Sequence, residues 1–325
     1  MPQKIVVVGG GIIGVSTAYF LSRHPANPSV TLIEASSIAC GASGKAGGLL
    51  ALDWHGVETA SLARLSYNLH ASLADQHNGR ERWGYRELNT LEVSCEEVSQ
   101  ANQNKSSNIP SWLRGHAIRK VRNIGSPKTT AQVHPRLFCE AMVQESKNLK
   151  IIRGYVTKIL GSAENPSTGV EVETDGVISV LEAEVVVVAA GPWTTKLLPS
   201  IPVSSQRAHS ITIGTTNPVS PYALFTSIKM RSGNVVTPEI YPRQHEIYAC
   251  GDIDKLVPLP KLAKDVQVDQ ERCKEIVKNI SALSELLEQG EVTAMQAPEQ
   301  SLEDPKTPGA VMEDSQNVAG DPVEE

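Results

Sequence analysis

The chain has 325 residues, which suggests about two domains and a core large enough to be stable. Its 40% hydrophobic and 20% charged residues are ordinary for a soluble protein, and a net charge of -6 argues against binding nucleic acid or an anionic membrane. No apolar run approaches the ~20 residues of a membrane span, and five scattered cysteines predict neither a disulfide framework nor a metal site, so we expect a cytoplasmic protein.

The first residues predict a strand, a helix and a second strand. Residues 4–8, KIVVV, are a β-branched apolar run typical of a buried parallel strand. A glycine-rich turn follows, then IIGVSTAYFLSRH with apolar residues at helical spacing, and SVTLIE ends the second strand at Glu34. The turn, 9–14, fits the pattern GxGxxG in the strand-to-helix context that a dinucleotide site requires.

Each residue of this motif has a physical role at a dinucleotide site. Gly9 permits the tight turn, Gly11 lets the backbone approach the pyrophosphate, and Gly14 lets helix and strand pack closely. The amides at the helix N-terminus would face the phosphates. The Glu34 carboxylate would accept hydrogen bonds from the ribose hydroxyls and repel a 2′-phosphate. The motif therefore predicts FAD or NAD.

A second glycine-rich stretch, GASGKAGG at 41–48, favours FAD over NAD. A flavin cofactor extends beyond the pyrophosphate into a ribityl chain and a three-ring head, which need another loop with close backbone approach. The stretch offers the Ser43 hydroxyl, the Lys45 cation and small residues around them. If it is only a surface loop, an NAD-dependent dehydrogenase remains the alternative.

The rest of the chain alternates helices and strands. Helices are expected over 57–77 and 134–148, a small β-meander from 150 leads to a buried strand at 185–188, and strand-like segments continue to 251. One amphipathic helix is expected over roughly 268–289. Residues 298–325 are rich in acidic residues and proline, which predicts a disordered acidic tail.

These elements predict an α/β fold with two domains. A Rossmann-type βαβ domain that binds FAD is expected from 1–56 and 130–200. A second, mixed-sheet α+β domain for the substrate is expected from 57–129 and 201–297.

The sequence resembles the FAD-dependent amine oxidoreductases of the D-amino-acid oxidase and glycine oxidase superfamily. The resemblance rests on VVVGGGIIGVSTAYFLS, VTLIEA and GASGKAGGLLA. GASGKAGGLLALDWHG and EIYPRQHEIYACG are closer still to a fungal branch of this group, and the similarity covers about residues 4–296. It implies FAD as the cofactor and a small-molecule amine or amino acid as the substrate.

The resemblance also adds candidate cofactor contacts late in the first domain. It implies that the Val156 backbone meets the adenine and that VVVVAAGPWT runs past the cofactor; the alternative for Val156 is plain strand core. The full set of candidate cofactor-binding residues is Gly9, Gly11, Ile12, Ile13, Gly14, Glu34, Ala35, Ala42, Ser43, Gly44, Lys45, Gly47, Gly48, Leu49, Val156, Ala190 and Gly191.

Three residues are candidates on the substrate side, where relatives use Tyr and Arg side chains. Tyr241 and Arg243 alternate along EIYPRQHEIY, so their side chains should share one face of a strand. Arg243 could bind a substrate carboxylate through two hydrogen bonds, or the pair could belong to core and rim. His55 could lie near the flavin, even as a covalent anchor, or be an ordinary packed or exposed histidine.

The similarity stops at Ala297, where relatives continue with a strand, a glycine-rich turn and a last helix against the flavin. Two hypotheses follow. The first is an enzyme that oxidises an amine or amino acid by hydride transfer to flavin. The alternative is a non-catalytic, truncated flavoprotein with weak FAD binding and a partner-binding role. Without that segment, we expect the chain to bind FAD poorly and to oxidise amines slowly or not at all.

Overall fold

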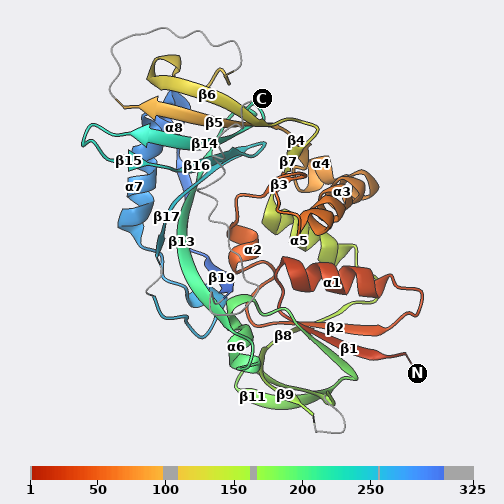
Figure 1. The fold of residues 1–325 in the computed structure, drawn as a ribbon. Helices are drawn as coiled ribbons and strands as arrows, with labels where there is room; N and C mark the ends of the chain where they lie inside the picture. Colours follow the sequence, from red (N-terminus) through yellow and green to blue (C-terminus); the bar gives the residue numbers. More distant parts are fainter. Residues whose placement is uncertain (1, 98–108, 162–166, 255–256, 304–325) are drawn as a thin grey trace.

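The protein is described by a computed structural model covering residues 2–97, 109–161, 167–254 and 257–303 (Figure 1). The first sheet has four parallel strands in the order β12-β1-β2-β8. They are β1 (Lys4–Val8), β2 (Ser29–Glu34), β8 (Lys150–Arg153) and β12 (Val185–Val188). The strand predicted at 185–188 is confirmed, and it pairs parallel with β1, with Val8 opposite Val188. This strand is half-buried at the sheet edge, not fully buried as expected.

Both faces of the parallel sheet are covered, which explains the unbroken apolar run of β1. Ile5 and Val7 pack toward α1 (Ile12–Ser22) and α5 (Pro135–Gln144). Val6 and Val8 face the other way, onto a three-stranded antiparallel meander. The meander consists of β9 (Tyr155–Leu160), β10 (Gly169–Thr174) and β11 (Val177–Glu182).

A group of short elements packs beside α1 and α5. It contains an antiparallel sheet in the order β3-β7-β4 and three helices. Their bounds are β3 (Leu49–Ala51), β4 (Arg86–Glu87), β7 (Thr130–Gln132), α2 (Ala42–Lys45), α3 (Ala60–His77) and α4 (Gly79–Arg82). Tyr67 and Trp83 share one core with Tyr19 and Phe138. The domain boundaries stay a prediction, and this packing favours assigning residues 60–82 to the first domain.

The second large sheet is mixed and lies across from the parallel sheet (Figure 1). Its order is β18-β13-β17-β16-β14-β5-β6, with β15 on β14 and β19 on β13. Strands β14 and β5 run parallel, and the remaining pairs are antiparallel. The bounds are β5 (Asn89–Glu96), β6 (Ile118–Gly125), β13 (Val203–Gly214), β14 (Tyr222–Lys229), β15 (Val235–Val236), β16 (Glu239–Pro242), β17 (Glu246–Asp254), β18 (Val292–Gln296) and β19 (Glu299–Glu303).

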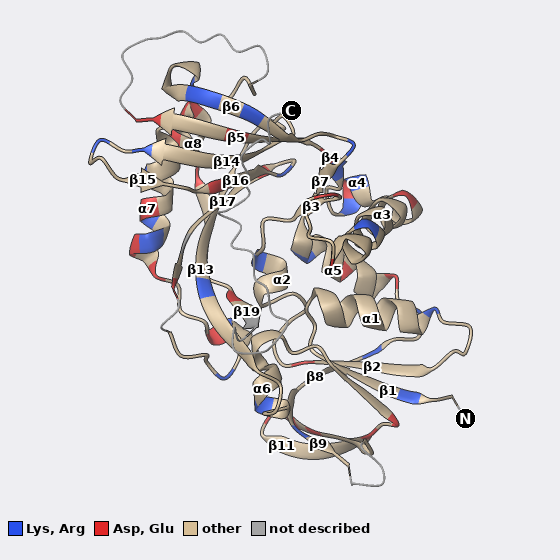
Figure 2. Cartoon of the chain, in the orientation of Figure 1, with Lys and Arg blue, Asp and Glu red and all other residues tan. Residues whose placement is uncertain are grey.

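Charge pairs fix the outer edge of this sheet. Figure 2 shows basic residues along β6. Arg119 pairs with Glu96, and Arg122 pairs with Glu92, both on the neighbouring strand β5. Opposite charges on adjacent strands stabilise this register. Short helices lie in the connections between these elements: η1 (Gly115–Ala117), η2 (Gly191–Trp193), α6 (Thr194–Leu197) and η3 (Ala263–Asp265).

The prediction of one amphipathic helix over 268–289 is wrong in one respect, because the segment forms two helices. α7 (Gln270–Ser281) begins at Asp269, whose carboxylate accepts from two amides of the first turn. α8 (Glu285–Gln289) begins after Ser284, which is extended and donates its hydroxyl to the Trp112 carbonyl at 2.6 Å. The predicted apolar face is nevertheless real, since Cys273, Ile276 and Leu287 are among its buried members.

The expectation of disorder from residue 298 is also wrong for the first residues of that segment. β19 pairs antiparallel with β13, from Val203 opposite Glu303 to Arg207 opposite Glu299. Its backbone therefore has a strand partner, which composition alone does not reveal. Residues 304–325 lie outside the described residues. Within the described part of the chain, no helix is long and apolar enough to cross a membrane.

Candidate functional site

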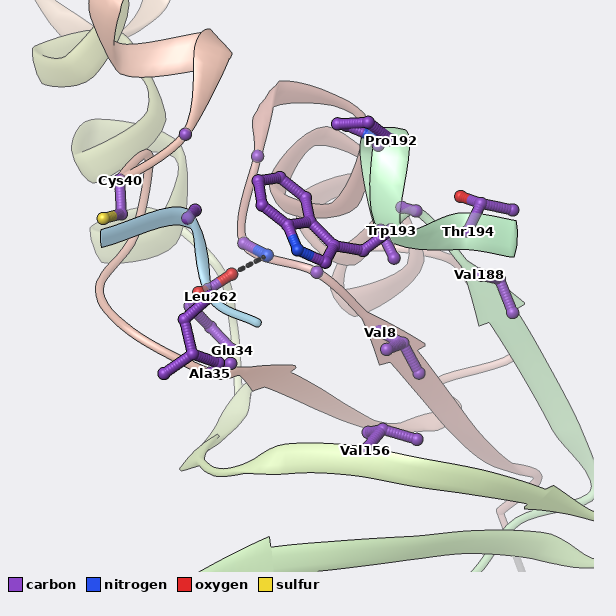
Figure 3. A pocket seen from close by; sticks show the side chains of 18 of the residues that line it. Val8, Glu34, Ala35, Cys40, Val156, Val188, Pro192, Trp193, Thr194 and Leu262 are labelled. Carbon is purple, nitrogen blue, oxygen red and sulfur yellow. Dashed lines mark hydrogen bonds between the residues drawn. The ribbon is translucent and has the colours of Figure 1, made fainter. Parts of the chain in front are cut away.

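A cavity of about 720 Å³ lies at the carboxyl ends of β1, β2 and β12. Its size falls in the range of small-molecule and cofactor sites, and its place is where ligands bind in open parallel sheets. Figure 3 shows Val8, Glu34, Val156 and Trp193 around it. Eleven predicted cofactor residues line it: Gly9, Gly11, Ile12, Ile13, Glu34, Ala35, Ala42, Ser43, Val156, Ala190 and Gly191.

The glycine-rich turn has the geometry that its sequence predicts. Gly9 has a φ of 110°, which favours glycine, and a Cβ there would overlap the Ala189 carbonyl. A Cβ on Gly14 would overlap the Gly9 carbonyl oxygen, so α1 can approach the turn only without a side chain there. Gly14 therefore shapes the site from outside the cavity lining.

The two glycine-rich stretches meet at the start of α1. The Ile12 amide donates to Ser43 Oγ at 2.9 Å, which satisfies one of the free amides of the helix N-terminus. The Ser43 hydroxyl keeps its proton available for an anion in the cavity. Amides and a hydroxyl at the N-terminus of a helix form a favourable site for a phosphate.

Glu34 is held in place by backbone amides. Its Oε2 accepts from the Gly10 amide at 2.7 Å, drawn as a dashed line in Figure 3, and its Oε1 accepts from the Ser36 amide at 2.8 Å. A carboxylate has about four lone-pair sites. The two that remain can accept from a pair of ribose hydroxyls, so the geometry suits the predicted role.

Most of the second glycine-rich stretch lies outside the cavity and packs against other protein atoms. Only Cys40, Gly41, Ala42 and Ser43 line the cavity, whereas Gly44, Lys45, Gly47, Gly48 and Leu49 lie outside its lining. A Cβ on Gly47 would overlap the Tyr241 ring, and one on Gly48, whose φ is 85°, would overlap the Val133 carbonyl. Burial lowers the pKa of Lys45. Glycine is needed at these positions because other protein atoms come close to the backbone. The sequence alone does not distinguish this need from close approach of a cofactor.

Tyr241 and Arg243 share one face of the mixed sheet, as predicted, and both contact Tyr248. The Tyr241 and Tyr248 rings stack with centroids 5.9 Å apart, and the Arg243 guanidinium lies 5.3 Å from the Tyr248 centroid. Arg243 is 6% exposed and donates to Glu246 and to the Ala46 carbonyl. Its charge is thus already paired.

Burial also keeps the phenols of this cluster protonated. Burial raises the pKa of Tyr241, and the charge of Glu239, which accepts from its hydroxyl, raises the pKa further. None of Tyr241, Arg243 and His55 lines the cavity. His55 is exposed. The structure therefore brings Tyr241 and Arg243 together at Tyr248, whereas no contact of His55 with either is seen among the described residues.

Several cavity residues were not predicted from the sequence. Trp193 lies in the middle of the close-up view (Figure 3), and its indole donates to the Pro260 carbonyl at 2.8 Å. That bond and one from Lys196 fix the segment that brings Leu262 to the cavity. Glu299 and Ser301 of β19 also line it. Trp193 could have been found in AAGPWT, but contacts from 260–263 and β19 depend on tertiary structure.

The fold and the site together define a FAD-dependent oxidoreductase. Residues 4–297 match the family described as DAO, FAD dependent oxidoreductase, and the chain belongs to that family. Among curated proteins it is 38% identical to "Putative oxidoreductase C1F5.03c" of Schizosaccharomyces pombe. It is 28% identical to "Putative oxidoreductase TDA3" of Saccharomyces cerevisiae. Both matches cover 91% of this chain and 82% of the relative.

Solved structures share the fold at lower identity. Glycine oxidase from Geobacillus kaustophilus superposes with a TM-score of 0.70 at 20% identity, covering 93% of this chain and 84% of that enzyme. L-proline dehydrogenase from P. horikoshii superposes with a TM-score of 0.67 at 14% identity, covering 92% and 82%. These similarities establish the fold, including its second, mixed-sheet part.

FAD is the cofactor of this family, and the cavity residues fit it. The backbone cradle at Gly9 and Gly11 leaves no room for side chains, since a Cβ on Gly11 would come within 2.9 Å of Ser43 Oγ. The helix N-terminus, Ser43 and the held carboxylate of Glu34 match a pyrophosphate and a ribose. Val156 is 5% exposed, belongs to the core beneath the sheet and also lines the cavity, where it offers an apolar wall that suits the face of an adenine.

Proposed function

We propose that the protein oxidises a small amine or amino acid. In this reaction a C–H bond next to nitrogen breaks with its electron pair, a proton leaves the nitrogen, and water hydrolyses the resulting imine to a carbonyl compound and ammonia. When bound, the flavin supplies the two-electron acceptor that oxygen or another oxidant restores. The structural neighbours named for glycine, proline and iminodiacetate act on compounds of this class.

One observation carries the proposal: an aromatic cluster of the mixed sheet packs directly on the second glycine-rich stretch. Tyr241 covers Gly47, with Tyr248 stacked behind it. Both phenols stay neutral at neutral pH; the Tyr241 proton is already donated to the Glu239 carboxylate, and the two buried rings exclude water. This arrangement supplies the dry, polar surface that a small amine needs beside a flavin.

We assign Arg243 a positioning role. Its bond to the Ala46 carbonyl, at 2.6 Å, ties the mixed sheet to the second glycine-rich stretch. A substrate carboxylate would have to displace Glu246 to reach the guanidinium. Carboxylate recognition by Arg243 and a role for His55 stay predictions, as does location in the cytoplasm.

The proposal is tested with purified protein that contains FAD. The absorption spectrum establishes bound flavin, and anaerobic addition of a panel of amines and D- and L-amino acids should bleach the flavin band for at least one compound. Aerobic assays should then show matching release of ammonia and peroxide, or reduction of an artificial acceptor. If dithionite bleaches the flavin but no amine or amino acid does, the amine-oxidising assignment is wrong, and the family membership still stands.

A further inference from the structure

A buried glutamate on the last described strand is part of the cavity lining. Glu299 is 2% exposed, and both of its oxygens are fully buried without a hydrogen bond of good geometry among the described residues. Glu299 nevertheless lines the cavity. A buried acid without full hydrogen bonding costs stability, which a ligand with hydroxyl groups would offset.

The neighbours of Glu299 stabilise its charge only in part. Arg207 is directly opposite on β13, but its guanidinium is committed to Asp254 at 2.7 Å and to the Gln267 carbonyl at 2.8 Å. Burial raises the pKa of Glu299, and the nearby Ser205 hydroxyl and Arg207 charge oppose this effect only in part.

A second polar group lies on the same face of β19. Ser301 is two residues further along the strand, so its side chain shares the face of Glu299, and it also lines the cavity. Its Oγ lies 3.7 Å from the position that a Cβ on Gly191 would take. Gly191 follows the carboxyl end of β12 and has a φ of 55°. Ser301 thus lies beside Gly191 at the cavity, and Glu299 lines the cavity from the same face of β19.

We propose that Glu299 and Ser301 bind the hydroxyl-bearing ribityl chain of FAD. The adenosine and pyrophosphate groups are accounted for by Glu34, Ser43 and the start of α1. The polyol chain follows the pyrophosphate in FAD. Its hydroxyls can donate strong hydrogen bonds to a buried carboxylate. This inference rests on FAD occupying the cavity, and it makes β19 part of the cofactor site.

The test compares FAD with ADP, which lacks the ribityl chain. Affinities of both ligands are measured by calorimetry for the unsubstituted chain and for Glu299→Ala, Glu299→Gln and Ser301→Ala. Gln300→Ala is the matched control, because this residue lies on the other face of the same strand. Thermal unfolding of each ligand-free variant is measured in parallel.

We expect Glu299→Ala to weaken FAD about tenfold, as for loss of a hydrogen bond to a charged group, and to leave ADP within about twofold. Glu299→Gln keeps an acceptor and should lose less, and Gln300→Ala should change neither ligand. Equal losses for FAD and ADP, or an unchanged FAD affinity in Glu299→Ala, would overturn the inference. If the unsubstituted chain binds ADP and not FAD, the cofactor assignment itself fails. If the Glu299 variants still bind FAD tightly, only the role of Glu299 is refuted.

Discussion

The two halves of the molecule hold their polar groups in different ways. In the parallel-sheet half, backbone groups build the site. Glycines at 9, 11 and 14 shape it, amides at the start of α1 line it, and two further amides hold the Glu34 carboxylate. The mixed-sheet half buries charged side chains in pairs, as in Arg207 with Asp254 and Arg243 with Glu246. The first half should therefore be sensitive to added atoms, and the second to changes in charge.

The largest expected effect is steric and falls on the backbone-built half. Gly14→Ala places a methyl group on the Gly9 carbonyl, between two backbone segments that cannot move separately. We expect a loss of about 3 kcal/mol in the free energy of unfolding, with loss of FAD, measured by urea denaturation and flavin content. Gly41→Ala is the control, because its Cβ would lie 3.7 Å from Ala263 Cβ, an ordinary contact. Equal stability of both variants would contradict this account.

The next effect is electrostatic and falls on the same half. Glu34→Arg removes the acceptor of the Gly10 and Ser36 amides and reverses the charge beside the ribose. We expect FAD to bind about a hundredfold more weakly, roughly 2.7 kcal/mol, while adenosine 2′,5′-bisphosphate gains affinity by charge attraction. Calorimetry with both ligands is the measurement, and Glu34→Gln is the matched control. Unchanged FAD affinity in Glu34→Arg would show that the ribose lies elsewhere.

The parallel-sheet half was largely predictable from the sequence, because short-range patterns determine it. GxGxxG followed by Glu34 specifies a turn, a helix and a strand end within about thirty residues. The strand β12 was predicted from its apolar run, and its place beside β1 was found in the structure. The break before α8 was not predictable, since it depends on Ser284 reaching the Trp112 carbonyl, 172 residues away in the chain.

The far end of the cavity escaped prediction for a similar reason. Glu299 lies in a segment whose composition is typical of disorder, and only pairing with β13 gives it a fixed place. Trp193 donates to the Pro260 carbonyl, 67 residues away in the chain, and the segment after Pro260 brings Leu262 to the cavity. The glycines at 44, 47 and 48 do mark places where other atoms come close to the backbone, as predicted, but these atoms belong to the protein.

A pH titration tests the boundary between the two halves. His134 precedes α5, and its Nε2 lies 3.5 Å from Glu246 of the mixed sheet. Burial lowers the pKa of His134 to about 4, with the Arg243 charge adding to the effect and Glu246 opposing it. The unfolded chain therefore takes up a proton near pH 6.5, whereas the folded chain does not until about pH 4.

Stability from His134 is thus fully present above pH 6.5 and declines as the pH falls toward 4. We expect the free energy of unfolding to fall by about 2 kcal/mol across this window, a value reduced for the 25% exposure of the side chain. His134→Asn, which does not titrate there, should flatten that part of the curve when urea denaturation is repeated from pH 4 to 7. A slope that is identical in both proteins would assign the acid sensitivity to other groups.

The smallest effect concerns the contact that joins the two glycine-rich stretches. Ser43→Ala leaves the Ile12 amide without its 2.9 Å acceptor and removes a hydroxyl that can donate to a phosphate. The freed amide can bind the phosphate directly, so the net loss should be that of one hydrogen bond, about 1 kcal/mol or roughly fivefold in affinity. Because the pyrophosphate is common to FAD and ADP, calorimetry should show the same loss for both ligands. A loss confined to FAD would place Ser43 beside the flavin end of the cofactor, and the second glycine-rich stretch would then serve the part of the site now assigned to β19.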